Sequence, residues 1–207
     1  MRTLQVDDDD VLASAVATLH AGEVVVVPTD TVYGLAAMPG DTAAVHKVYL
    51  AKRRPPRLNL PLLGASLDQV RQLGVEISDA AVTLASRWWP GPLTMAFGFS
   101  DTEVRPEWLA GREEVAVRIP AHPFLLDLVE QTGVLMVTSA NPHGAATPPT
   151  AREAADNLAP HVGLVIDGGV LDATPSTLVN MCARQPVVER EGAISRKAIA
   201  DALAGRG

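Results

Sequence analysis

The chain has 207 residues, of which 47% are apolar, and this composition favours one domain over residues 1–207 with a substantial core. The formal net charge of −7 argues against a surface that coats nucleic acid, and the single cysteine rules out an internal disulfide and a cysteine-based zinc site. No apolar run has the length of a membrane span, and the N-terminus lacks the apolar segment of a signal peptide, so we expect a cytoplasmic protein.

Apolar runs and turn formers alternate along the chain without repeats or linkers. The first half predicts, in order, a helix from the acidic run 7–10 to 20, a strand over 24–27, a helix from 41 to the prolines at 55–56, a strand over 60–65, helices over 67–73 and 79–89, and a strand over 93–99. The second half predicts a strand over 115–119, a helix over 123–131, a strand over 134–138, a loop over 141–150, a helix over 151–158, strands over 163–166, 177–181 and 186–190, and a helix over 195–203. This order is typical of an α/β domain around a mixed sheet.

The first candidate site follows the valine run at 24–27. Four β-branched residues in a row predict a strand buried on both faces, and Pro28 ends it because proline has no N–H for a sheet. Thr29, Asp30 and Thr31 then place oxygen-bearing side chains at the strand end, where ligands collect in α/β proteins. From the residues alone, a turn that merely stops the strand is an equally good interpretation.

The second candidate is a basic segment that holds Lys52, Arg53, Arg54 and Arg57. If the chain is extended from 52 to 54, the side chains of Lys52 and Arg54 point the same way. Both residue types suit phosphate and carboxylate oxygens, although a solvated basic loop is the commoner explanation of such a run. In a chain of net charge −7, a compact cluster of cations favours an anionic ligand.

Polar residues also interrupt or end several other apolar runs. Arg118 stands inside the predicted strand 115–119, where it needs either an ion pair or a polar cavity because an unpaired buried charge is costly. Further polar residues at or beside the ends of such runs, for several of which a cap or turn is the simpler explanation, are Thr138, Ser139, Asn141, Ser176 and Arg190. Paired carboxylates, a nucleophile–base set and a glycine-rich phosphate loop do not stand out, so these residues indicate only a pocket for a small anionic ligand such as a nucleotide.

Eight stretches taken together resemble the YrdC domain, the fold of L-threonylcarbamoyladenylate synthases. In chain order they are PTDTVYGLAA at 28–37, AKRRP at 51–55, PL at 61–62, WPGPLT at 89–94, VAVRIPAHP at 115–123, TSANPHG at 138–144, PSTLV at 175–179 and EREGAI at 189–194. Each is weak alone, but eight in the family's order over nearly the whole chain are specific. The resemblance implies an open, twisted mixed sheet flanked by helices, with a concave, positively lined cavity.

The resemblance also implies a nucleotidyltransferase that converts L-threonine, bicarbonate or CO2, and ATP into L-threonylcarbamoyladenylate and pyrophosphate. ATP is then a substrate, and Mg²⁺ is expected on its phosphates, with no ligands identified in the chain. The product would pass to the machinery that makes the t6A modification of tRNA. Direct binding of tRNA by this chain is not expected, and neither is a membrane partner.

Motif position implies a role for each matching residue. Lys52 and Arg54, of the family's lysine-x-arginine motif, would be catalytic. The residues implied for L-threonine are Thr31, Arg118 and Ser176. Those implied for ATP are Lys52, Arg54, Ser139, Asn141 and Arg190. Those implied to shape the pocket are Pro28, Tyr33, Pro55 and Thr138. Asp30 is interpreted as a turn and solvation residue.

Two features depart from the family pattern. Five residues, 56–60, separate the proline of the basic motif from the PL pair, where three are usual, and Ala65 stands near the place of a threonine-contacting histidine in some members. The chain is otherwise similar to short members without an additional C-terminal domain. Two alternatives stay open: a diverged YrdC-like protein that handles another carbamoyl-adenylate, and a non-catalytic RNA-binding module, which the acidic balance disfavours.

Overall fold

The computed structural model describes residues 1–56, 58–100, 104–171 and 174–205, so Arg57 of the basic segment lies outside the described residues. Within these ranges, ten strands form one mixed sheet in the order β1-β8-β2-β3-β7-β4-β6-β5-β9-β10. The strands are β1 (Arg2–Gln5), β2 (Val25–Val27), β3 (Gly34–Ala37), β4 (Leu62–Leu63), β5 (Leu93–Gly98), β6 (Glu114–Arg118), β7 (Leu135–Ser139), β8 (Leu164–Asp167), β9 (Thr177–Asn180) and β10 (Val187–Arg190). The predicted α/β class with a mixed sheet is confirmed.

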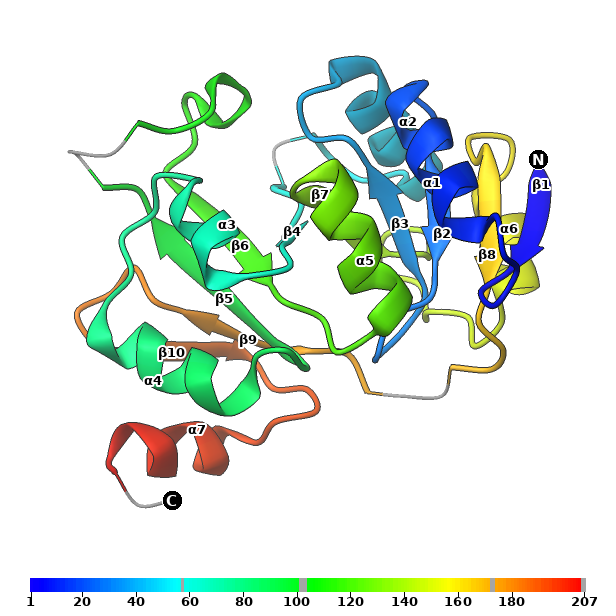
Figure 1. The fold of residues 1–207 in the computed structure, drawn as a ribbon. Coiled ribbons are helices and arrows are strands. Elements are labelled where there is room, and N and C mark those ends of the chain that lie inside the picture. The colour runs from blue at the N-terminus through cyan, green and yellow to red at the C-terminus, as the bar shows by residue number, and fades with distance from the viewer. Residues whose placement is uncertain (57, 101–103, 172–173, 206–207) are drawn as a thin grey trace.

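Helices flank this sheet in two groups (Figure 1). They are α1 (Val11–His20), α2 (Thr42–Lys52), α3 (Leu67–Arg71), α4 (Asp79–Trp88), α5 (Pro123–Thr132), α6 (Ala151–Leu158) and α7 (Arg196–Leu203), with a short 3-10 helix at Glu107–Leu109. Helices α1 and α5 pack against each other over the half of the sheet that contains β2, whereas α4 and α7 pack together beside β5 and β9. No helix of the described residues is long and apolar enough to cross a membrane.

The valine strand lies between two apolar clusters. Val25 and Val27 belong to the cluster under α1 and α5, and Val24 and Val26 belong to the larger cluster that includes α2 and α6. All four are 0% exposed, because successive side chains of a strand point to opposite faces. The predicted burial on both faces is confirmed.

Helix starts follow the capping residues in the sequence. The Asp41 carboxylate accepts hydrogen bonds from the backbone N–H groups of Ala43 and Ala44 at the start of α2. Hydroxyl groups do the same work for α3, α4, α6 and α7, from Ser66, Ser78, Thr150 and Ser195. These caps explain why helix positions could be predicted to within a few residues.

Strand β3 was not predicted and is central to the fold. Val27 of β2 pairs with Gly34 of β3, so the turn at 28–33 joins the two strands directly. On its other edge β3 pairs with β7, with Gly34 opposite Ser139. A side chain at Gly34 would meet the Val137 side chain at 2.6 Å, so the close approach of β3 to β7 requires glycine there. Through β3, the 28–37 motif lies beside the 138–144 motif.

Candidate functional site

The turn between β2 and β3 is held by its own hydroxyl groups. The Thr29 hydroxyl accepts from the backbone N–H groups of Thr31 and Val32 at 3.0 and 3.1 Å and donates to the Val32 carbonyl at 2.7 Å. Thr29 and Thr31 are both buried, and their hydroxyl oxygens lie 3.0 Å apart. The turn is therefore a fixed structure that holds the Thr31 hydroxyl in one place.

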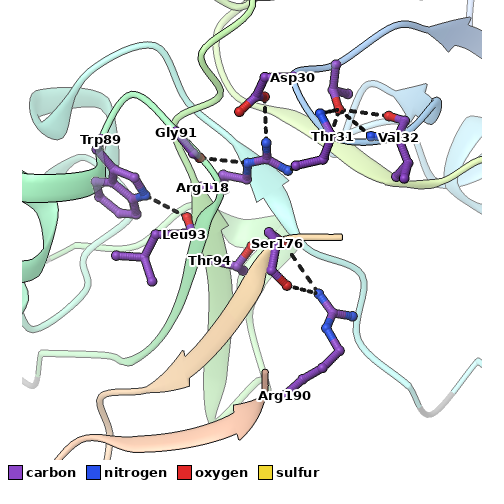
Figure 2. A network of polar contacts seen from close by, with 11 residues as sticks. Asp30, Thr31, Val32, Trp89, Gly91, Leu93, Thr94, Arg118, Ser176 and Arg190 are labelled. Atoms are coloured by element: carbon purple, nitrogen blue, oxygen red, sulfur yellow. Dashed lines mark hydrogen bonds and ion pairs between the residues drawn. The ribbon is translucent and has the colours of Figure 1, made fainter. Parts of the chain in front are cut away.

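Arg118, the last residue of β6, reaches across to this turn. Its guanidinium donates to the Thr31 hydroxyl at 2.8 Å and to the Asp30 carboxylate at 2.5 Å (Figure 2). A third bond runs from Nε to the Gly91 carbonyl at 2.9 Å. The interpretation of Asp30 as a turn and solvation residue was wrong, because its carboxylate is the ion-pair partner of a buried arginine.

A second polar cluster joins β5, β9 and β10. The hydroxyl oxygens of Thr94 and Ser176 lie 2.8 Å apart, and Arg190 donates to the Ser176 carbonyl at 2.9 Å. The register brings them together, because β5 pairs in parallel with β9 from Leu93 and Thr177 onward. Burial and the nearby charge of Arg118 both lower the pKa of Arg190. The two arginines thus face a common region although 72 residues separate them in sequence.

An extended chain from 52 to 54 was considered above, but the structure shows a helix end there instead. Lys52 is the last residue of α2 and Arg53 is its left-handed C-cap, with φ 50°. The Lys52 ammonium is buried, and it donates to the Ser139 carbonyl and to the Asn141 carbonyl, the latter at 2.7 Å. Burial and the charge of Arg54 lower the pKa of Lys52 to about 8. Lys52 therefore connects the end of α2 to the loop after β7 by hydrogen bonds.

Arg54 takes the other direction. Its Nη2 donates to the Asn59 carbonyl at 2.9 Å and its Nε to the Leu58 carbonyl at 3.3 Å, so it braces the loop that follows α2. Burial lowers the pKa of the Arg54 guanidinium. The unusual 56–60 segment is in this way attached to the second basic residue of the motif.

These pieces surround one cavity of about 680 Å³. Eight predicted site residues line it: Thr31, Tyr33, Arg54, Arg118, Thr138, Ser139, Ser176 and Arg190. Of the described residues that line it, none is Lys52, Asn141, Pro28 or Pro55, so these four lie behind the wall or beside it. Pro28 packs against Gly168. A Cβ added to Gly168 would lie 2.7 Å from the Cβ of Pro28 and 4.0 Å from the Tyr33 hydroxyl.

The cavity also has lining residues that the sequence reasoning missed. Thr94, Glu114 and Glu189 contribute a hydroxyl and two carboxylates, and Leu58 and Asn59 come from the basic loop. Thr94 ends the WPGPLT motif and could have been found there. Three arginines, Arg54, Arg118 and Arg190, thus face a cavity with two carboxylates on its wall.

Metal ligands are not grouped in the part of the chain that the structure describes. There, no three or more His, Cys, Asp or Glu side chains come together in a way that could hold an ion. The three arginines of the cavity supply donors that suit anionic oxygens.

The family models match residues 17–192 to the Sua5/YciO/YrdC family, described as "Telomere recombination". Among curated proteins, the chain is 37% identical over 194 residues to the threonylcarbamoyl-AMP synthase of Bacillus subtilis, covering 93% of this chain and 56% of that protein. The threonylcarbamoyl-AMP synthase of Mus musculus is 38% identical over 169 residues, covering 81% of this chain and 59% of that protein. The chain spans about half the length of several curated relatives that it matches.

Solved structures agree in fold. Pyrococcus abyssi Sua5, crystallised with L-threonine, superimposes with a TM-score of 0.87 at 32% identity over 99% of this chain and 61% of that one. Escherichia coli YciO superimposes with a TM-score of 0.83 at 26% identity, covering 96% of this chain and 97% of that one.

Proposed function

Because the chain belongs to the Sua5/YciO/YrdC family, we propose that it is an L-threonylcarbamoyladenylate synthase acting in the cytoplasm. The observation that carries the proposal is the shared cavity, where Arg54, Arg118 and Arg190 stand around three hydroxyl-bearing motif residues, Thr31, Thr138 and Ser176. Such a site can hold two anions close together. Relatives of this chain in bacteria, archaea and animals are named threonylcarbamoyl-AMP synthase.

The proposed reaction has two steps. The amine of L-threonine adds to the carbon of CO2 and releases one proton, which gives a carbamate. A carbamate oxygen then attacks the α-phosphorus of ATP, and the bond to the β-phosphate oxygen breaks, which releases pyrophosphate. No covalent enzyme intermediate is needed. The protein has to bring two anions together and offset their repulsion, which is catalysis by positioning and electrostatics.

The cavity walls divide naturally between the two substrates. We assign L-threonine to Thr31, Arg118 and Ser176, with the carboxylate on Arg118, because arginine binds carboxylates through parallel N–H groups. We assign ATP to Arg54, Ser139 and Arg190, with Lys52 and Asn141 holding the loop of Ser139 from behind. Pro28, Tyr33, Pro55 and Thr138 shape the cavity.

Magnesium and the later fate of the product complete the proposal. Mg²⁺ would arrive on the phosphates of ATP, as is usual for this ion, and we assign it no protein ligand. The product would pass to the enzymes that make t6A, with no direct contact between this chain and tRNA.

The test is pyrophosphate release by the purified protein with ATP, bicarbonate and L-threonine. We expect release that depends on L-threonine, and release that is indifferent to it would refute the proposal. Arg54→Ala should lose most of the activity. Arg53→Ala, which changes the exposed neighbour outside the cavity, is the matched control and should retain it.

A second candidate function has one specific observation in its favour. Leu58, Asn59 and Leu60 of the unusual 56–60 segment line the cavity, so the segment that departs from the family pattern is in a position to affect amino-acid choice. A related synthase for another amino acid would show higher pyrophosphate release with that amino acid than with L-threonine. A panel of the common amino acids in the same assay separates the two functions.

A further inference from the structure

The ion pair between Arg118 and Asp30 joins a buried arginine to a largely buried carboxylate. Arg118 Nη2 and Asp30 Oδ1 lie 2.5 Å apart, and the two side chains are 8% and 14% exposed. The contact links the end of β6 to the β2–β3 turn, 88 residues apart in sequence. Removing one partner of such a pair leaves an uncompensated charge, so each residue constrains the other.

The guanidinium of Arg118 is only partly occupied by these contacts. An arginine carries five N–H donors. Among the described residues, its partners are the Gly91 carbonyl, the Thr31 hydroxyl and the Asp30 carboxylate, one through each of its three nitrogens. Nη1 and Nη2 therefore each keep one N–H for a ligand, and three contacts on different sides fix the plane of the group.

Asp30 stands on the far side of the guanidinium from the cavity wall. Arg118 and Thr31 line the cavity, whereas Asp30 is not among the described residues that do so. In Figure 2 the guanidinium lies between Asp30, Gly91 and Thr31, with Ser176 and Arg190 on the other side of it. The side-chain contact through which Asp30 can act on a ligand is its bond to Arg118.

Charge gives Asp30 a second effect on the same group. Arg118 is close enough to Arg190 for its charge to lower the pKa of that residue. Two cations facing one cavity repel each other before a substrate arrives, and the bond to Asp30 keeps the Arg118 guanidinium in place against this repulsion. Groups that are fixed in advance need no reorganisation when the ligand binds.

We propose that Asp30 is a positioning residue for the amino-acid substrate, holding the Arg118 guanidinium so that its two remaining N–H groups meet the substrate carboxylate. The inference rests on the proposed function. It assigns Asp30 no contact with substrate. It predicts that loss of Asp30 weakens amino-acid binding and leaves the ATP side of the cavity nearly unchanged.

The experiment compares Asp30→Ala and Asp30→Asn with the wild type in the pyrophosphate assay, varying L-threonine and ATP separately. Asp30→Ala should raise KM for L-threonine by roughly tenfold or more, a change equivalent to about 1.4 kcal/mol of binding free energy. KM for ATP should stay within about twofold of the wild-type value. Asp30→Asn keeps an oxygen that accepts from Arg118, so its KM for L-threonine should lie between the two. Glu23→Gln, which breaks the half-exposed pair with Lys47 away from the cavity, should leave both constants unchanged.

The possible outcomes separate the two proposals. A wild type without L-threonine-dependent release refutes the proposed function and the inference with it. An active wild type with unchanged KM for L-threonine in folded Asp30→Ala and Asp30→Asn refutes the inference alone. Equal rises in both KM values also refute it, because they indicate a general structural role. Thermal unfolding checks each variant, and if Asp30→Ala does not fold, the KM for L-threonine of Asp30→Asn decides.

Discussion

At the scale of the residue, Tyr33 connects the first motif to the segment that follows β8. Its side chain is fully buried, and its hydroxyl donates to the Gly169 carbonyl at 2.6 Å and accepts from the Gly168 N–H at 3.0 Å. Tyr33→Phe removes these bonds, and their partners at the half-buried Gly168 and the exposed Gly169 can turn to water. We expect the free energy of unfolding to fall by about 0.5–1.5 kcal/mol, measured by urea denaturation. A loss below about 0.5 kcal/mol would contradict this account of the hydroxyl.

The same hydroxyl predicts a loss of stability at alkaline pH. Burial raises the pKa of Tyr33 from 10.0 to about 12. Because the folded pKa is the higher one, Tyr33 stabilises the fold fully below pH 10, and this contribution declines as the pH rises to about 12. The decline should be about 1.4 kcal/mol per pH unit, and Tyr33→Phe should lack it. Unfolding curves of both proteins across this range make the comparison.

Arg53 gives a prediction of the opposite sign. It is a non-glycine residue in the left-handed region, with φ 50°, and it ends α2 as its C-cap. Glycine is favoured at such positions because a Cβ is strained there. Arg53→Gly should raise the free energy of unfolding by about 0.5–1 kcal/mol, the strain relieved minus the extra freedom of the unfolded chain. Arg53→Lys, which keeps the Cβ, should show no gain.

At the scale of the element, Lys52 connects the end of α2 with the loop after β7. Its ammonium has a pKa of about 8 in the folded protein against 10.5 in the unfolded chain. Between these values the unfolded chain binds more protons, so stability should rise with pH by up to about 1.4 kcal/mol per unit. Urea unfolding at about pH 7.5 and about pH 9.5 should show this rise in the wild type and its loss in Lys52→Met. Parallel curves for the two proteins would disprove the assignment.

The helices were predictable, whereas two strands, β1 and β3, were not. Strand β3 shows the physical reason. Asp41, Thr150 and Ser195 cap helices through hydrogen bonds a few residues away, so the signal is local. Strand β3 contains small residues without strong strand preference and exists because β2 and β7 pair on both of its edges. Its partner β7 begins about a hundred residues later, and such pairing leaves no local pattern.

The site residues, like the elements, were predictable where the signal is local in sequence. The motif residues Thr31, Arg54, Arg118, Ser176 and Arg190 were predicted and lie on one cavity. The role of Asp30 could not be predicted, because its partner is remote in sequence and its side chain stands behind the wall. The direction of Lys52 depended on where α2 ends, and helix ends are the least predictable part of an element.

At the scale of the whole molecule, the acidic balance makes a prediction about nucleic acid. A net charge of −7 offers few phosphate contacts outside the cavity, and binding of a polyanion depends on many. We expect no shift of tRNA in a native gel at about 150 mM salt with micromolar protein. A salt-sensitive shift without ATP would instead favour the RNA-binding alternative.

The strand order has a consequence for how the chain folds. Arg2 of β1 pairs with Leu164 of β8, and Leu93 of β5 pairs with Thr177 of β9. Strands from the first half of the sequence therefore cannot complete their pairing until the last quarter has been synthesised. Contacts of such long range slow folding, since the loop must close before the pairing stabilises it. While the chain is being synthesised, the sheet keeps unpaired edges until β8 and β9 have emerged, which exposes it to aggregation. Recovery of this protein from cells should therefore depend more on translation rate and temperature than its equilibrium stability would suggest.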